Sequence, residues 1–520
     1  MDRKLIIEQY KRFSESCLWR MQRDYFDKAG IDAWVNQVPF YITSNPYIAN
    51  FYAEISINFI SDWISKHPEA KNHPFYILEL GTGSGRFSYY VLKRIHELKT
   101  ALGMTDISIC YVMSDFTKNN IRYYESHSAL KFFIEQGFVD FALFDMEVEK
   151  PITLIHSNVV LSPETLVNPL ITFANYIFDT VSHDAFSVKQ GKLYELLLSV
   201  STPESNLENN KPVDMSQLSI DFKTNEIKKS YYNDPDLDNI LEQYRNSLSD
   251  SNFLFPIGSI RAIKLLKKLS NNKLMILSSD KGYSTLQSLD RLGYPSISFH
   301  GSFSMMVNFH AIANYFKNSG GDYFLQTPRK GIKTSLFLSN TQLDNLTLTK
   351  LAVEKYIEGV SAADYFTLHR RVSDSFNELN LETIAAHLNF TGWDPHIYLK
   401  LANRITKLVE VSDLDTINFL ASNMHKLAKN YYYMPKSDCI LFEIAVFFHA
   451  IKRFDDALNY YLEAQEFVGE QFGVHYNLAL CQHNLGNTVD ALDNFKIALR
   501  IDPNSKEAQE WITYIEKSKE

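Results

Sequence analysis

The sequence predicts an α/β fold with a doubly wound, largely parallel sheet, followed by an all-α C-terminal region. Apolar strand patterns alternate with helical patterns between residues 77 and 338, which is typical of parallel strands joined by helices. Within this region, Asp322–Gln326 and Thr334–Leu338 flank the turn sequence Thr-Pro-Arg-Lys-Gly and predict a closing hairpin. Residues 438–471 and 472–505 align as a repeat of 34 residues, which predicts two equivalent helix pairs.

The first predicted strand ends in a glycine-rich turn. Residues 77–87 read Ile-Leu-Glu-Leu-Gly-Thr-Gly-Ser-Gly-Arg-Phe, so that Gly81, Gly83 and Gly85 alternate with other residues. Because glycine lacks a Cβ atom, the backbone can turn sharply here and approach a ligand closely. The helical period that follows completes a strand–turn–helix unit. The order E-x-G-x-G-x-G differs from the dinucleotide fingerprint G-x-G-x-x-G, which argues against an NAD-dependent oxidoreductase; a purely structural turn stays open as the alternative.

The remaining strands and helices follow in order along the chain. Strands are expected at 107–113, 138–144, 169–173 and 273–277, and helices from Thr117 to Gly137 and at 305–317. The first four strands each end at or near a polar residue. In open α/β sheets the ligand lies outside the carboxyl ends of the strands, so we expect these polar residues to converge on one rim.

Composition limits the classes of function. The chain has 520 residues, 45% of them hydrophobic and 22% charged, and a net charge of −9, which disfavours a generic nucleic-acid binder. Its four cysteines form no CxxC pair or Cys/His cluster, so we expect neither a disulfide framework nor a metal site. No apolar run approaches the ~20 residues of a membrane span, and no targeting segment is evident, so we expect a cytoplasmic protein.

The glycine turn with its preceding Glu79 resembles motif I of S-adenosylmethionine (SAM) methyltransferases. Further blocks, in the same order over roughly residues 1–340, resemble the MidA-like family of these enzymes. They are the segment 39–64, the stretch Ala-Asn-Tyr-Ile-Phe-Asp-Thr-Val at 174–181, Asp-Lys-Gly-Tyr at 280–283, and the segment 303–320. The resemblance implies a Rossmann-like sheet that ends with an antiparallel strand, SAM as the cofactor, and methyl transfer, which in one family member modifies protein arginine.

For the cofactor, the resemblance and the position of the rim imply a set of contacts. The residues are Thr43, Ser44, Glu79, Gly81, Thr82, Gly83, Gly85, Asp115, Phe116, Asp145 and Met146. We expect Asp115 to accept hydrogen bonds from both ribose hydroxyls, with a helix N-cap as the alternative. We expect Asp145 to accept from the adenine amino group, with a surface turn acid as the alternative, and Glu79 to order the glycine loop.

Asn175, Tyr176 and Asp179 follow the fourth strand and are expected to face the methyl acceptor. Asn175 could accept from a substrate N–H, Tyr176 could shield the sulfonium with its ring, and Asp179 is the nearest candidate base. A hydrogen-bonded structural loop is the alternative. The family has Glu where Tyr176 stands, and its proline after this motif is absent. Because a guanidinium acceptor is held best by carboxylates, the loss of Glu weakens the arginine assignment.

The chain is expected to contain three parts. These are a helical segment at 1–65, a methyltransferase domain at 66–342 whose insertion at 182–272 caps the substrate, and an α-helical domain at 343–520. The insertion contains a predicted β-ribbon that turns at Gly191 and helices at 236–248 and 256–269. The repeat resembles tetratricopeptide (TPR) units, which commonly bind peptides or proteins; buttressing the catalytic domain or forming a homodimer are the alternatives.

The sequence therefore predicts a SAM-dependent methyltransferase that acts on a protein side chain. One alternative is a non-catalytic adaptor with a degenerate methyltransferase fold and TPR-mediated protein binding. The other is a small-molecule methyltransferase whose helical region only oligomerises. No contact with nucleic acid or membrane is expected.

Overall fold

The computed structural model describes residues 4–36, 44–207, 213–434 and 437–518. The chain divides into two compact units, Met1–Leu368 and His369–Glu520, here called the N-terminal and C-terminal units. The division falls later than the predicted domain boundary between residues 342 and 343, because helix α11 (Thr347–Val353) is tied to helix α3 (Pro46–Lys66). The Asp62 carboxylate in α3 accepts hydrogen bonds from the backbone N–H groups of Leu348 (3.2 Å) and Thr349 (2.8 Å).

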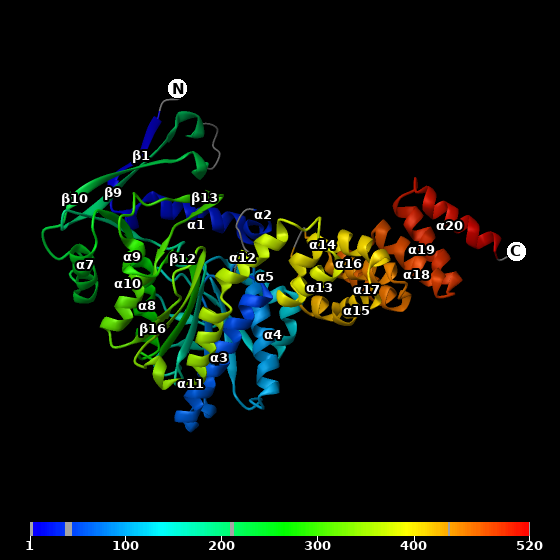
Figure 1. Ribbon diagram of the computed structural model, residues 1–520, viewed down its shortest axis with the longest axis horizontal. Coiled ribbons are helices and arrows are strands. Elements are labelled where there is room, and N and C mark those ends of the chain that lie inside the picture. The colour runs from blue at the N-terminus through cyan, green and yellow to red at the C-terminus, as the bar shows by residue number, and fades with distance from the viewer. Residues whose placement is uncertain (1–3, 37–43, 208–212, 435–436, 519–520) are drawn as a thin grey trace. The chain divides into compact units, whose positions relative to one another are not determined.

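The N-terminal unit contains a main sheet, of which β12 and β16 are labelled in Figure 1. Its strand order is β16-β17-β12-β7-β2-β3-β4. The strands are β2 (Phe75–Glu79), β3 (Ile109–Asp115), β4 (Val139–Leu143), β7 (Leu170–Asn175), β12 (Leu274–Tyr283), β16 (Asp322–Leu325) and β17 (Ile332–Leu338); the short β15 (Val307–Asn308) pairs with the end of β12. From β12 to β4 all neighbours are parallel, whereas β17 lies antiparallel between β12 and β16. The predicted parallel sheet and its closing hairpin are therefore both present.

Helices cover both faces of the main sheet. On one face lie α3 and α4 (Arg86–Ala101), where the Tyr52 ring packs edge-on against Phe87 and Phe173 with ring centroids 5.0 Å apart in each pair. On the other face lie α8 (Ile257–Leu269) and α10 (Phe309–Asn318), whose apolar side chains share one core with Leu78 and Val112. The alternation of side chains along each buried strand supplies both cores.

One predicted helix is broken. The helix expected from Thr117 to Gly137 consists of α5 (Lys118–Ser126), a 3-10 turn at Ser128–Leu130 and α6 (Lys131–Glu135). At the break, His127 has extended backbone angles, and its ring nitrogen Nδ1 accepts a hydrogen bond from the Ala129 N–H at 3.2 Å. A side chain that caps the next turn in this way ends the preceding helix.

A second, antiparallel sheet is the main correction to the predicted N-terminal unit. It has the order β1-β9-β8-β11, with β10 also pairing with β9. Its strands are β1 (Lys4–Lys11), β8 (Asp184–Lys189), β9 (Lys192–Pro203), β10 (Ser219–Glu226) and β11 (Ser251–Phe255). The ribbon turning at Gly191 is confirmed as β8 and β9, but residues 1–65 are not wholly helical, because β1 pairs with β9 far along the chain.

Helix α1 (Cys17–Ala29) packs on this second sheet. Leu18 and Trp19 of α1 belong to an apolar cluster with Leu196 and Leu198 of β9. This unit contains further helices and strands. They are α2 (Ala33–Asn36), β5 (Ile152–Thr153), β6 (Val160–Leu161), α7 (Pro235–Ser247), α9 (Leu286–Leu289), β13 (Ser298–His300), β14 (Ser302–Ser304) and α12 (Ala362–Ser373), the last of which runs into the C-terminal unit.

The C-terminal unit consists of helices in sequence. They are α13 (Leu381–Phe390), α14 (Pro395–Leu408), α15 (Leu414–Lys429), α16 (Ile440–Ala450), α17 (Phe454–Val468), α18 (Phe472–Asn484), α19 (Thr488–Ile501) and α20 (Lys506–Lys517). The 34-residue repeat corresponds to the pairs α16–α17 and α18–α19, and most of its matched residues are buried in both pairs. These include Ile444 and Leu478, Ala457 and Ala491, Tyr461 and Phe495, and Ala464 and Ala498. The likeness to TPR units stays a prediction.

Two kinds of feature are absent from the described residues. In those ranges, no helix combines the length and the apolar character needed to cross a membrane. Within the same ranges, no three His, Cys, Asp or Glu side chains are grouped so as to hold a metal ion.

Candidate functional site

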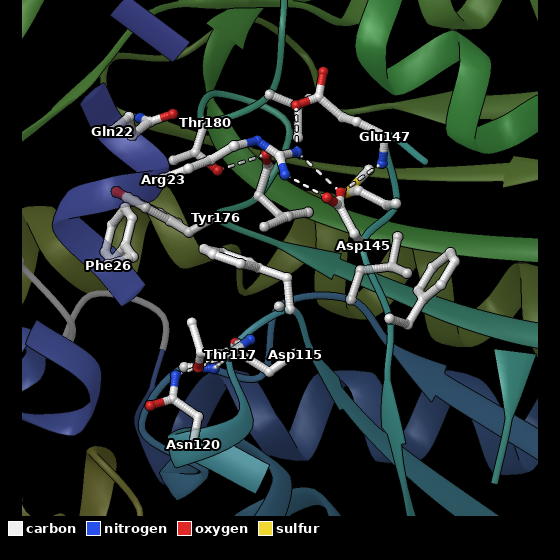
Figure 2. A pocket seen from close by; sticks show the side chains of 18 of the residues that line it. Gln22, Arg23, Phe26, Asp115, Thr117, Asn120, Asp145, Glu147, Tyr176 and Thr180 are labelled. Carbon is white, nitrogen blue, oxygen red and sulfur yellow. Dashed lines mark hydrogen bonds and ion pairs between the residues drawn. The ribbon is translucent and has the colours of Figure 1, made fainter. Parts of the chain in front are cut away.

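A pocket lies at the carboxyl ends of β2, β3 and β4, on the rim that the sequence predicts (Figure 2). Its hollow measures about 90 Å³. The lining comes from the glycine loop (Leu80, Gly81, Gly83), the residues after β3 (Asp115, Phe116, Thr117, Asn120), those after β4 (Phe144, Asp145, Met146, Glu147), those after β7 (Tyr176, Ile177, Thr180, Val181) and the N-terminal helices (Gln22, Arg23, Phe26, Trp34). The sequence predicted members of the first four groups and none of the last.

Glu79 orders the glycine loop from below. Its buried carboxylate accepts hydrogen bonds from the Thr82 hydroxyl (3.1 Å) and from the Ser88 hydroxyl of α4. Burial raises the pKa of Glu79 to about 7, although these hydrogen bonds act in the opposite direction. Gly81, Gly83 and Gly85 have φ values of 60°, 65° and 78°, the left-handed region that glycine adopts without strain. Glu79, Thr82 and Gly85 shape the loop but are not among the described lining residues.

Asp115 lines the pocket and is buried. Its Oδ1 accepts from the backbone N–H (2.9 Å) and hydroxyl (2.8 Å) of Thr117, the N-cap residue of α5. Its Oδ2 accepts from Asn120 Nδ2 (3.1 Å), the Tyr124 hydroxyl (3.3 Å) and the Gly83 N–H (3.4 Å). Because a carboxylate offers about four lone-pair sites, a ribose hydroxyl would have to replace one of these donors. Asp115 thus holds the glycine loop to α5, and its ribose role stays a prediction.

Asp145 is paired with Arg23, a residue that the sequence did not indicate (Figure 2). Both terminal nitrogens of Arg23 in α1 donate hydrogen bonds to the Asp145 carboxylate, with Nη2 2.9 Å from Oδ1. The same Nη2 also donates to Glu147 Oε2 at 3.0 Å. Burial acts to raise the pKa of Asp145, but the hydrogen bonds and charge of Arg23, together with the Glu147 N–H and the charge of Lys150, lower it on balance. In this structure the carboxylate predicted for the adenine amino group therefore has a guanidinium partner. The adenine role stays a prediction.

The three residues predicted for the acceptor side lie in different surroundings. Tyr176 lines the pocket, and its φ of 52° is unusual for a residue with a side chain. Asn175 is not among the described lining residues; its Oδ1 accepts from the Tyr52 hydroxyl at 3.5 Å. Asp179 is also outside the described lining and is buried against Asp280, whose Oδ2 accepts from the Asp179 N–H at 3.1 Å. Of the three, only Tyr176 therefore reaches the pocket.

Thr43 and Ser44 are the residues predicted from the segment before α3. Ser44 precedes Asn45, the N-cap of α3, whose Oδ1 accepts from the Ile48 N–H at 3.0 Å. Ser44 is not among the described residues that line the pocket. Thr43 lies outside the described residues.

Two side chains lie directly against the glycine loop. A Cβ atom at Gly81 would lie 2.5 Å from Ile177 Cδ1, and one at Gly83 would lie 2.8 Å from Trp34 Cζ2. Trp34 stacks in turn on Phe26 of α1, with ring centroids 6.0 Å apart. Only glycine fits at these two positions. The surface of the loop is therefore covered by protein side chains.

No protein-family model matches the chain, and no curated protein matches it. Among solved structures, it is similar to a COG1565 superfamily member from Burkholderia thailandensis bound to S-adenosyl-homocysteine, whose expected activity is methyl transfer. The identity is 13%, the alignment covers 61% of this chain and 75% of that one, and the TM-score is 0.40. An uncharacterized COG1565 superfamily protein from the same organism aligns at 11% identity over 63% of this chain and 95% of its own, with a TM-score of 0.34. MamA AMB-1 aligns at 18% identity over 26% of this chain and 79% of its own, with a TM-score of 0.18. At these values none of the likenesses establishes the fold or the activity of this chain.

Proposed function

We propose that the protein is a SAM-dependent methyltransferase. The proposal rests on one observation: the glycine loop and a buried carboxylate lie together at one rim of the main sheet. The glycine loop after β2 and the carboxylate after β3 line the same pocket, and Gly83 donates its N–H to that carboxylate at 3.4 Å. The sheet itself carries an antiparallel strand between β12 and β16, as the methyltransferase resemblance implies.

The lining fits the cofactor in chemistry but not in volume. Glycine backbone, a carboxylate and the apolar surfaces of Phe116 and Met146 suit an aminoacyl-linked nucleoside. Small-molecule sites have volumes of roughly 300–1,000 Å³, whereas this hollow measures about 90 Å³. Occupancy therefore requires the side chains that cover the loop, Trp34 and Ile177, to move.

When bound, SAM supplies a methyl group on a cationic sulfonium. The chain's own residues would exclude water and place the acceptor, because in-line approach needs orientation above all. The Tyr176 ring lines the pocket and offers a face that attracts a cation. Asp179 is not assigned as a base, since it is buried against Asp280 and is not among the described residues that line the pocket.

The acceptor is proposed to be a protein side chain, with the helical C-terminal unit recruiting a protein or peptide. Arginine is the less favoured acceptor within this proposal. The pocket carboxylates of Asp145 and Glu147 already bind Arg23, and Tyr176 stands where the family has Glu. A small-molecule acceptor is the alternative for the same site.

A second candidate function is an adaptor that has the fold but binds no cofactor. The contacts of Trp34 and Ile177 with the glycine loop favour it. Its partner would be bound by the C-terminal unit.

Calorimetric titration of the full chain with S-adenosylhomocysteine (SAH) separates these functions. The methyltransferase predicts saturable binding in the micromolar range, abolished in Gly81→Val, whose side chain would enter the space of Ile177. Far-UV circular dichroism would confirm that this variant folds. The absence of binding at millimolar SAH, both in the wild type and after Trp34→Ala, would overturn the methyltransferase and leave the adaptor.

A further inference from the structure

We propose that Cys17–Asn36, comprising α1 and α2 and here called the plug segment, blocks the glycine loop with Trp34 and must release it before the cofactor binds. This inference rests on the proposed function. It assigns Trp34 the role of an intramolecular competitor and Arg23 the role of its latch.

The first argument is the place of the Trp34 ring. Three of its carbons lie 2.8, 3.1 and 3.2 Å from where a Cβ of Gly83 would be. Gly83 donates its N–H to Asp115, which fixes this part of the glycine loop. The Trp34 ring covers the same part of the loop. A ligand that approaches this backbone has to displace the ring.

The second argument concerns the indole N–H of Trp34. Its indole N–H is buried and has no hydrogen-bond acceptor among the described residues. An unpartnered buried donor is unfavourable, and indoles usually pair this group. Apart from the loop, the described ring contact of Trp34 is its stacking on Phe26. The plug therefore depends on shape and apolar contact, which a ligand ring can replace.

The third argument is the latch, which is drawn in Figure 2. Arg23 bridges Asp145 and Glu147, which follow β4, so it ties α1 to the rim. A paired guanidinium of this kind gives direction as well as attraction. The latch holds the plug segment over the pocket without occupying the glycine loop itself.

The fourth argument is where the plug segment can bend. The first half of α1 is anchored, because Trp19 Nε1 donates to the Phe13 carbonyl (2.7 Å) and Gln22 Nε2 donates to the Phe303 carbonyl (2.8 Å). Gly30, with φ of 50°, ends α1, and the short α2 that carries Trp34 follows it. In the proposed release, Arg23 keeps α1 at the rim while the part of the plug segment beyond Gly30, which carries Trp34, moves away from the glycine loop.

The consequence is a measurable reduction of affinity. If the binding-competent arrangement is populated only in part, the apparent dissociation constant rises by the inverse of that fraction. Removing the ring removes the competition, so a plug that is released about 10% of the time predicts about tenfold tighter binding by the variant.

The test titrates the full chain with SAH by calorimetry in three forms: wild type, Trp34→Ala and Trp63→Ala. Trp63 is the matched control, because this half-buried tryptophan of α3 stacks on Phe59 and lies outside the described lining. We expect Trp34→Ala to bind SAH at least threefold more tightly than the wild type and Trp63→Ala to bind like it. Binding by Trp34→Ala alone would also support the plug.

Equal or weaker binding by Trp34→Ala, with the wild type binding, would overturn the plug and leave the proposed function intact. Failure of all three forms to bind would overturn both. If Trp34→Ala does not fold, fluorescence decides: SAH should shift the tryptophan emission of the wild type to the red and leave that of Trp34→Phe unchanged. An identical shift in both proteins would contradict release of the ring.

Discussion

The two walls of the pocket are built in opposite ways. The loop wall, formed by the glycine loop and the start of α5, is tied together by Asp115, whose partners all lie between residues 83 and 124. The cover wall, formed by α1 and α2, comes from the start of the chain and is joined to the rim through Arg23 and Asp145, 122 residues apart. Local hydrogen bonds fix the loop wall, whereas in the cover wall α1 is anchored and only the part beyond Gly30 is proposed to move. This contrast has measurable consequences for stability.

The loop wall should be intolerant of losing its central carboxylate. Asp115→Ala leaves several buried donors without an acceptor, and we expect a loss of about 4 kcal/mol in the free energy of unfolding. Urea unfolding of the full chain measures it. The control is Asp106→Ala, an exposed acid, with an expected change within about 0.5 kcal/mol. Similar losses in both variants would show that the loop wall is not rigidly tied.

At Gly83 the loop wall meets the cover wall, so the stability cost of adding a side chain there should depend on both walls. Gly83 and Gly103 have φ values of 65° and 66°, but only at Gly83 would an added Cβ atom have neighbours within 4 Å, the carbons of Trp34. We expect Gly83→Ala to cost about 2–3 kcal/mol and Gly103→Ala about 1–2 kcal/mol, the latter reporting backbone strain alone.

The excess cost at Gly83 should disappear when the cover wall is trimmed. In the Trp34→Ala background, Gly83→Ala should cost the same as Gly103→Ala, because the ring that crowds it is gone. The same unfolding measurement applies. An excess that persists without Trp34 would mean that the crowding comes from within the loop wall.

In the cover wall, the ion pair of Arg23 with Asp145 should show a measurable coupling energy. A double-mutant cycle of Arg23→Ala and Asp145→Ala should give a coupling energy of about 1–2 kcal/mol, since the pair is bidentate and only partly exposed. The comparison pair, Lys131 and Glu135, is a more exposed ion pair at 3.9 Å and should give less than about 0.5 kcal/mol. Equal coupling energies in the two cycles would contradict the proposed role of Arg23 as a latch.

The two walls should also differ in the direction of their pH dependence. Burial raises the pKa of Glu79 from 4.5 to about 7, so the folded protein binds more protons than the unfolded chain in this interval. Stability is lost as pH rises through it, by at most about 1.4 kcal/mol per pH unit. We expect Glu79→Gln to flatten the slope by about 1 kcal/mol between pH 5 and pH 6.

Asp145 should behave in the reverse manner. Its pKa is lowered, so its contribution is present above the usual aspartate pKa and is lost as pH falls below it. Asp145→Asn should therefore remove part of the loss of stability that the wild type shows between neutral pH and pH below 4. The dependence of the free energy of unfolding on pH between pH 5 and pH 6 should stay as in the wild type. Urea midpoints across this pH range would show whether the windows are separate.

Local pattern was sufficient for the frame of the main sheet and for half of the pocket. The run that ends at Glu79 is buried strand β2, and the alternating glycines form a left-handed loop at its end. The hairpin of β16 and β17 was evident from its turn residues, and the repeated helix pairs from their spacing. Each of these features depends on neighbours in sequence, so periodicity and turn chemistry report them.

The sequence by itself determined where the glycine loop would lie and which acidic residues would flank it. Only the tertiary structure decided what covers that backbone. Strand β1 pairs with β9 and α1 packs on the resulting sheet, which brings Arg23 to an acid 122 residues away in the chain and Trp34 to the glycine loop. Such pairings leave no periodic trace, because each partner is chosen by complementary surfaces that exist only once both have folded.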